Sequence, residues 1–290
     1  MQKDFSNRAT APALDAVLGA EHPVLDHGFV RVVDYMGNDA AVVQAARVSY
    51  GAGTKTSRDD AGLIRYLMRH RHTSPFEMCV LKLHIKAPVF VARQWLRHRT
   101  AAVNEISARY SILKDEFYSP DPAFMAAQSS NNKQGRSRDP LPLEQAERAK
   151  EAIDQNARRA YAAYEGLLTS EEGGLARELA RLTLPVNVYT EWYWRIDLHN
   201  LLHFLQLRLD AHAQYEIRAY AEVIAGIAHK WVPFAWAAFE AYRLGGASLS
   251  SGQLAWLRAK LGGRDVQAET KGMTAGERRE LLALLGLSET

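Results

Sequence analysis

The chain is poor in the features that mark secreted, membrane or disulfide-stabilised proteins. Among its 290 residues there is one cysteine, Cys79, which excludes an internal disulfide and fits a reducing compartment. No apolar run is long enough to span a membrane, and residues 1–20 lack the basic start and apolar core of a secretory signal. We therefore expect a soluble, cytoplasmic protein without a membrane partner.

Strong charge of either sign is also missing. The net charge is +3, which is too small to predict a nucleic-acid partner by itself. The chain has no Gly-x-Gly-x-x-Gly motif, so it lacks the phosphate loop of a Rossmann domain. Its composition, 47% hydrophobic and 24% charged, is that of an ordinary globular chain with enough material for a sizeable core.

The strongest local feature is a concentration of positive charge in residues 94–111. Its basic residues are Arg97, His98, Arg99 and Arg109. They are accompanied by a single acid, Glu105, and such crowding of like charge costs stability unless an anion compensates it. A phosphorylated ligand is the first hypothesis, because the planar guanidinium can bind phosphate through two hydrogen bonds. The alternative is a solvated basic face packed by neighbouring apolar side chains.

The spacing within this stretch suggests two ligand-facing surfaces. Pro88 suits the first turn of a helix, on which Gln94, Arg97 and His98 would share one face. Residues 103–111 alternate as in an extended strand. That strand would direct one set of polar side chains to the same side: Glu105, Ser107, Arg109 and Ser111.

Other periodic segments predict both strands and helices. Strands are expected at 28–37, 76–86 and 186–196, and helices at 40–48, 143–168, 198–238 (with breaks near His212 and Pro233) and 253–261. Asp39 is expected to cap the helix that follows it, and Thr274 with Glu277 forms a capping box for a last helix. Cys79 falls in the apolar row of a strand, so we interpret it as a core residue rather than a nucleophile.

The sequence also carries an ordered set of motifs. Arg97-His98-Arg99, followed by seven residues and Ser107, is its centre. The other blocks are Ser49–Gly51, His72–Glu77, Ala87–Trp95, Leu184–Glu191 and Leu205–Ile217. Together they run from about residue 29 to 242 in the order found in the flavin-dependent thymidylate synthases, also called the thymidylate synthase complementing protein family, which this chain resembles.

The resemblance implies a fold and an assembly. The expected fold is α+β, a small, mainly antiparallel sheet packed with helices plus a helical portion. It would occupy residues 28–243, between an N-terminal extension at 1–27 and a C-terminal helical extension at 244–290. The polar loop 119–142 could be a mobile lid or a disordered segment. The family implies a homotetramer with shared active sites.

The reaction implied is the reductive methylation of dUMP to dTMP. 5,10-Methylenetetrahydrofolate would supply the carbon, and FAD reduced by NADPH would supply the hydride. Arg208 would be catalytic, favouring loss of the uracil N3 proton by stabilising the anionic ring. Ser107 is assigned to the phosphate, because no base at triad-like spacing would activate it as a nucleophile.

Carried over position by position, the resemblance names two sets of ligand residues. The dUMP set is Gln94, Trp95, Leu96, Arg97, Glu105, Ile106, Ser107, Ala108, Arg109, Arg181 and Arg208. The FAD set is Ser49, His72, Ser74, Glu77, Arg97, His98, Arg99, Glu105, Asp197, His199, His203, Leu207 and His212. Several family members carry Asn or Arg where this chain has Asp197, His199 and His203, which leaves the flavin contacts there less defined.

Three readings of the residues remain beside the resemblance. His199 and His203 have the spacing of two zinc ligands on a helix, as in a zinc hydrolase, although the adjacent general-base glutamate is missing and no metal is expected. The basic cluster could serve a nucleic-acid-binding module, but it is interleaved with polar and acidic residues rather than spread as a stripe. Arg208 could form a structural ion pair with the neighbouring Asp210.

Overall fold

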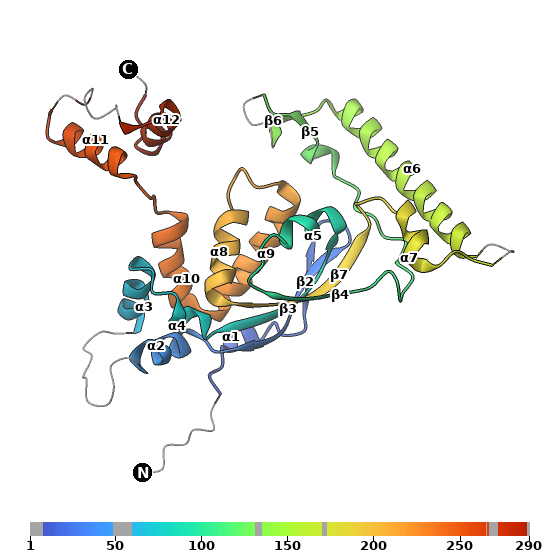
Figure 1. The fold of residues 1–290 in the computed structure, drawn as a ribbon, viewed down its shortest axis with the longest axis horizontal. Coiled ribbons are helices and arrows are strands. Elements are labelled where there is room, and N and C mark those ends of the chain that lie inside the picture. Colours follow the sequence, from blue (N-terminus) through green and yellow to red (C-terminus); the bar gives the residue numbers. More distant parts are fainter. Residues whose placement is uncertain are drawn as a thin grey trace, which may run out of the picture. The chain divides into compact units, whose positions relative to one another are not determined.

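The computed structural model describes residues 8–48, 60–130, 135–169, 173–264, 266 and 272–288. The chain forms two compact units, residues 1–239 and 240–290. Each unit has its own packed elements, shown in Figure 1.

A five-stranded sheet is the centre of the first unit (Figure 1). Its strands, in spatial order, are β1 (Glu21–Val24), β2 (Gly28–Met36), β3 (Val80–Pro88), β7 (Tyr189–Asp197) and β4 (Ala102–Glu105). Every neighbouring pair is antiparallel. The predicted α+β fold with a small antiparallel sheet is thereby confirmed.

The sheet has one buried and one polar face because its two central strands alternate. On β3, Leu81, Leu83 and Ile85 are fully buried, whereas the intervening Lys82 is exposed. On β7, Trp194 is likewise fully buried. Helices α8 (Leu198–Arg208) and α9 (Tyr215–Trp231) pack against the sheet, and the ring of the buried Trp194 contacts that of Phe204 on α8.

Helices surround the sheet. They are α1 (Pro12–Asp15), α2 (Asp39–Val48), α3 (Asp60–Arg69), α4 (Ser74–Glu77), α5 (Val89–Trp95), α6 (Leu143–Leu168), α7 (Arg177–Ala180), α8 (Leu198–Arg208), α9 (Tyr215–Trp231) and α10 (Pro233–Phe239). The 3₁₀ turns are η1 (Pro122–Phe124) and η2 (Arg181–Thr183), and β5 (Ala126–Gln128) pairs with β6 (Arg136–Pro140) in a hairpin. The predicted helix 143–168 and the breaks near His212 and Pro233 are confirmed.

Two expectations about strands are wrong. The strand expected from residue 76 begins at Val80, because Ser74–Glu77 forms the short helix α4 with Pro75 at its start. The extended stretch expected at 103–111 ends at Glu105 with β4. The N–H groups of Tyr110 and Ser111 both turn back to the carbonyl of Ser107, so a turn replaces the alternation.

The capping role expected of Asp39 is also wrong. The side chain of Asn38 accepts the N–H of Ala41 at 3.2 Å and caps α2. The buried carboxylate of Asp39 instead accepts the N–H groups of Phe234 and Ala235, at 2.8 and 2.9 Å. Asp39 therefore caps α10, which lies far away in the sequence.

The expected polar loop 119–142 contains regular secondary structure. Its described residues include η1 and the β5–β6 hairpin, which the sequence did not predict because this stretch has no regular hydrophobic period. The backbone N–H of Leu141 donates to the carbonyl of Met125 at 2.8 Å, which closes the hairpin just before α6.

The second unit consists of a π-helical turn, η3 (Glu240–Leu244), and two helices, α11 (Ser251–Leu261) and α12 (Ala275–Leu284). Both helices begin with a capping box, and the one expected from Thr274 and Glu277 is confirmed. A small core of Trp256, Leu281 and Leu282 joins them. Among the described residues, every helix is too short or too polar to cross a bilayer.

Candidate active site

The basic stretch is anchored to the core by Trp95. The indole of Trp95 is fully buried, and its ring centroid lies 5.2 Å from that of Trp194, 4.8 Å from Phe204 and 5.8 Å from Tyr220. This aromatic cluster fixes the end of α5 against β7, α8 and α9. The side chain of Trp95 is thus a core residue, and only its backbone can face a ligand.

Helix α5 ends at Trp95, so the expected helical face of Gln94, Arg97 and His98 is wrong. The N–H of Arg97 bonds to the carbonyl of Gln94 and that of His98 to the carbonyl of Trp95, both three residues back. Such i→i+3 bonds tighten the last turn and redirect the chain. As a result Arg97 is exposed and His98 turns inward, half-buried.

His98 meets Arg208, which lies at the C-terminal end of α8. The Nε–H of Arg208 donates to Nε2 of His98 at 3.1 Å, and its Nη2 lies 3.4 Å from the backbone carbonyl of Gln94. The expected alternative, an ion pair between Arg208 and Asp210, is wrong, because the Asp210 carboxylate bonds to the backbone and ring of His212. The structure therefore brings together three predicted site residues from two separate sequence blocks.

Burial lowers the pKa values of both His98 and Arg208. Burial lowers the pKa of His98 to about 4, with the positive charge of Arg208 and the nearby His203 acting in the same direction. Burial also lowers the pKa of Arg208. At neutral pH the site therefore presents a neutral imidazole beside a charged guanidinium.

Gln214 is a contact that sequence reasoning missed. The side-chain amide of Gln94 donates to the side-chain oxygen of Gln214, which precedes α9. This bond ties the α8–α9 connection to the end of α5. The only signal in the sequence was the position of Gln214 between the matching residues of the last family block.

A second group of predicted residues lies around α7. The guanidinium of Arg109 forms an ion pair with Glu178 at 3.3 Å, and Nε of Arg181 donates to the backbone carbonyl of Glu178, also at 3.3 Å. Arg177 donates to the carbonyl of Tyr110 at 2.7 Å. In Figure 1, α7 and α8 lie at separate places in the first unit. In the described part of the chain, no hydrogen bond or ion pair joins Arg109 to Arg208.

The turn that follows β4 carries the predicted phosphate residues. Ser107 Oγ accepts the backbone N–H of Arg109 at 3.2 Å, which stabilises the turn, and Ala108 is buried behind it. Glu105 accepts the hydroxyl of Thr190 at 2.7 Å. Leu96 and Ile106 are exposed, at 39% and 43% of their surface.

The remaining flavin candidates lie at or near α4 and α8. The N–H of Leu198 donates to the carbonyl of Cys79 at 2.8 Å, so the start of α8 meets the segment that follows α4. The members of this group are His72, Ser74, Glu77, Asp197, His199, His203, Leu207 and His212. Asp197 caps α8 by accepting the backbone N–H of Asn200 at 2.9 Å, and its second carboxylate oxygen accepts the side-chain amide of Asn200 at 2.8 Å. Ser49 lies outside the described residues.

The donor set of these groups fits an anionic, hydrogen-bonding ligand. Arg97 and Arg99 are exposed, and in the part of the chain that the structure describes their guanidinium groups have no side-chain partner. Unpaired guanidinium groups beside imidazole rings are suited to a diphosphate and to the polar edge of a flavin ring. The residues present therefore fit FAD. The described residues contain no group of three or more His, Cys, Asp or Glu side chains placed to hold a metal ion.

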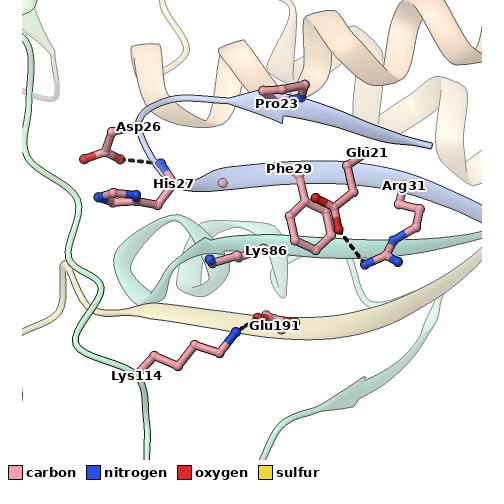
Figure 2. A pocket seen from close by; sticks show the side chains of 10 residues that line it. Glu21, Pro23, Asp26, His27, Phe29, Arg31, Lys86, Lys114 and Glu191 are labelled. Carbon is pink, nitrogen blue, oxygen red and sulfur yellow. Dashed lines mark hydrogen bonds and ion pairs between the residues drawn. The ribbon is translucent and has the colours of Figure 1, made fainter. Parts of the chain in front are cut away.

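A pocket of about 380 Å³ lies elsewhere, at the β1–β2 end of the sheet (Figure 2). None of the predicted ligand residues lines it. Four of its charged groups are already paired: Arg31 with Glu21 at 2.9 Å, and Lys114 with Glu191 at 3.7 Å. Lys86, which is buried, pairs with Glu116 at 2.7 Å. We interpret these contacts as a structural ion network.

The fold and site define a class of protein: an α+β protein whose arginine and histidine side chains, rather than a glycine-rich loop, suit an anionic ligand. Residues 31–234 match the family model described as "Thymidylate synthase complementing protein". The chain is 58% identical to the flavin-dependent thymidylate synthase of Ruegeria pomeroyi, covering 97% of this chain and 93% of the relative. It is equally similar to that of Gluconobacter oxydans, 58% identical over 98% of this chain and 93% of the relative.

A solved structure agrees with these sequence matches. The UMP/dUMP methylase PolB from Streptomyces cacaoi, bound with 5-Br UMP, superposes with a TM-score of 0.68 at 35% identity, covering 76% of this chain and 97% of PolB. The chain belongs to the flavin-dependent thymidylate synthase family. The resemblance predicted from the sequence is confirmed.

Proposed function

We propose that this protein catalyses the reductive methylation of dUMP to dTMP. 5,10-Methylenetetrahydrofolate is the carbon donor and NADPH the reductant. The proposal is supported by membership of the family and by the similarity to PolB, of which a second solved structure, 33% identical with a TM-score of 0.67, is bound with 5-Br dUMP. The observation that carries it is the Arg208 guanidinium, held by His98 and by the carbonyl of Gln94 at the end of the basic motif.

Two groups of side chains would bind the dUMP. Gln94, Arg97 and Arg208 form the first group, near the ends of α5 and α8. The second group, near α7, consists of Glu105, Ser107, Ala108, Arg109 and Arg181, with the exposed Leu96 and Ile106 beside the basic motif. The arginines and the Ser107 hydroxyl suit the phosphate, because guanidinium and hydroxyl groups both donate to its oxygens.

The separation of these two groups in one chain supports a shared site. Each group contains cationic side chains, and the helices nearest to them, α8 and α7, lie apart within the first unit (Figure 1). In a homotetramer, one copy would supply the Arg208 group and another the Arg109 group to the same nucleotide. We propose such a tetramer, located in the cytoplasm.

The FAD would be held by Arg97, Arg99 and the histidines near α4 and α8. The chemistry that FAD would supply there is the transfer of electrons from NADPH, as hydride, to the methyl group being formed. The role of Arg208 is electrostatic: its permanent positive charge stabilises the negative charge that develops on the uracil ring when the N3 proton is lost. His98 cannot be the general base for that proton while its Nε2 lone pair accepts the Nε–H of Arg208.

The first experiment is the visible absorption spectrum of the purified protein, with and without dUMP. We expect an oxidised-flavin spectrum that bleaches with NADPH, followed by dTMP formation when dUMP and methylenetetrahydrofolate are added. A protein that is colourless and takes up no added FAD would contradict the proposal. Activity that is lost on chelation, together with stoichiometric metal, would instead favour a zinc hydrolase.

A further inference from the structure

We propose that His98 is a positioning residue for Arg208: its imidazole accepts the Nε–H of the guanidinium and thereby sets the orientation in which that group meets the substrate. The inference rests on the proposed function of Arg208 in dUMP methylation. It assigns His98 a role distinct from that of a flavin contact.

The geometry restrains the guanidinium at two points. Nε lies 3.1 Å from Nε2 of His98, and Nη2 lies 3.4 Å from the carbonyl of Gln94. Both acceptors belong to the segment at the end of α5, which the buried Trp95 anchors in the core. A guanidinium has five N–H groups, so two directed to the protein leave three for a ligand. Two acceptors on one rigid segment define the plane of the group.

The imidazole is itself held by the helix that carries Arg208. The ring of Phe204 meets that of His98 edge-on, with centroids 4.9 Å apart and planes at 72°. Phe204 and Arg208 are four residues apart on α8 and so lie on the same face. His98 is thus clamped between an aromatic side chain and the guanidinium that it orients.

The hydrogen bond requires one protonation state and one tautomer. Arginine only donates, so Nε2 of His98 must carry a lone pair, and the proton of the neutral ring is on Nδ1. The titratable and charged groups that face His98 from α8 are Arg208 and His203, and Arg97 and Arg99 flank it in the sequence. Burial, with the charge of Arg208 and the nearby His203 acting in the same direction, keeps the pKa of His98 low, so the accepting form is present at neutral pH.

Two substitutions separate positioning from packing. His98→Gln retains an acceptor close to the position of Nε2, whereas His98→Leu fills the same space without one. We expect His98→Leu to lower kcat roughly 100-fold, the scale of a misplaced catalytic group, with a smaller change in the KM for dUMP. His98→Gln should recover most of that loss. His229→Leu, at an exposed position of α9, is the matched control and should leave kcat unchanged.

A second measurement does not depend on turnover. In the full-length protein with ¹⁵N-labelled histidine, the NMR signals of His98 should show an unprotonated Nε2 and a protonated Nδ1 at pH 7. Its titration midpoint should lie well below the ordinary value and rise in Arg208→Met. A protonated Nε2, a midpoint that Arg208→Met does not move, or an unchanged kcat in His98→Leu would overturn the proposal. If NMR shows the expected tautomer of His98 but no dTMP forms, the proposed function is wrong, whereas the hydrogen bond between His98 and Arg208 is still supported.

Discussion

Nη2 of Arg136 lies 2.7 Å from Oε2 and 2.9 Å from Oε1 of Glu216, so one guanidinium nitrogen donates to both carboxylate oxygens. Glu216 is only 4% exposed and also accepts the hydroxyl of Tyr118 at 3.3 Å. Beside it, the rings of Phe124 and Tyr215 stack at 4.1 Å. These contacts fasten η1 and the β5–β6 hairpin to the first turn of α9.

Replacing Arg136 by methionine tests the strength of that attachment. The Glu216 carboxylate would remain buried without its cation, so we expect the free energy of unfolding to fall by about 3 kcal/mol. Urea denaturation measures the change. The control is Arg148→Met, which removes an exposed ion pair with Glu144 on α6 and should cost less than about 1 kcal/mol. Equal losses of stability in the two variants would show that the buried pair contributes no more to stability than the exposed pair.

Arg208→Lys tests the proposed electrostatic role. Lysine keeps the positive charge but lacks the planar fork that reaches His98 and the Gln94 carbonyl together. We expect kcat to fall by about 10²- to 10³-fold, as on loss of one transition-state donor. Flavin content, measured by visible absorption, should stay at the wild-type level, as it should in the control Arg258→Lys on α11. Retention of full turnover would rule out a need for the guanidinium geometry.

The low pKa of His98 predicts a dependence of stability on pH. The folded pKa, about 4, lies below the ordinary histidine value of 6.5, so above pH 6.5 the ring is neutral in both states. As the pH falls from 6.5 towards 4, only the unfolded chain gains the proton, and the folded state loses stability. His98→Gln removes this effect. As the pH is lowered from 7.5 to 5, the thermal unfolding midpoint of this variant should therefore rise relative to that of the wild type. A difference in unfolding midpoint between variant and wild type that stays constant across that range would contradict the low pKa of His98.

Cys79 should be dispensable for turnover. Its side chain is fully buried, its thiol donates to the carbonyl of Asn38 at 3.4 Å, and burial raises its pKa to about 12, with the charge of Asp39 adding to the shift. We expect Cys79→Ala to keep its kcat and to lose about 1 kcal/mol of stability through the small cavity. Alkylation of wild type by iodoacetamide should be negligible until the protein unfolds. A large loss of kcat in a folded Cys79→Ala variant would assign the thiol a role in the reaction.

Much of the fold could be predicted because its signals are local. The helix Leu143–Leu168 and the capping box of Thr274 with Glu277 were predicted from residues close together in the sequence. The same holds for the buried alternation of Leu81 and Leu83 on β3. The family was also recognisable, since ordered motifs are a property of the sequence. Errors arose where a local pattern had a non-local competitor, as when Asp39 capped α10 rather than α2.

The candidate site, like the fold, has features that the sequence predicted and features that depend on tertiary contacts. The sequence by itself determined which residue types are present: the guanidinium, imidazole and hydroxyl groups that suit a nucleotide and a flavin. Only the tertiary structure decided that His98 accepts from Arg208, 110 residues away, and that Arg109 belongs to a separate group around α7. The physical reason is that hydrogen bonds act over about 3 Å in space. Spacing along the chain cannot predict such contacts until sheet pairing and helix packing have fixed where each segment lies.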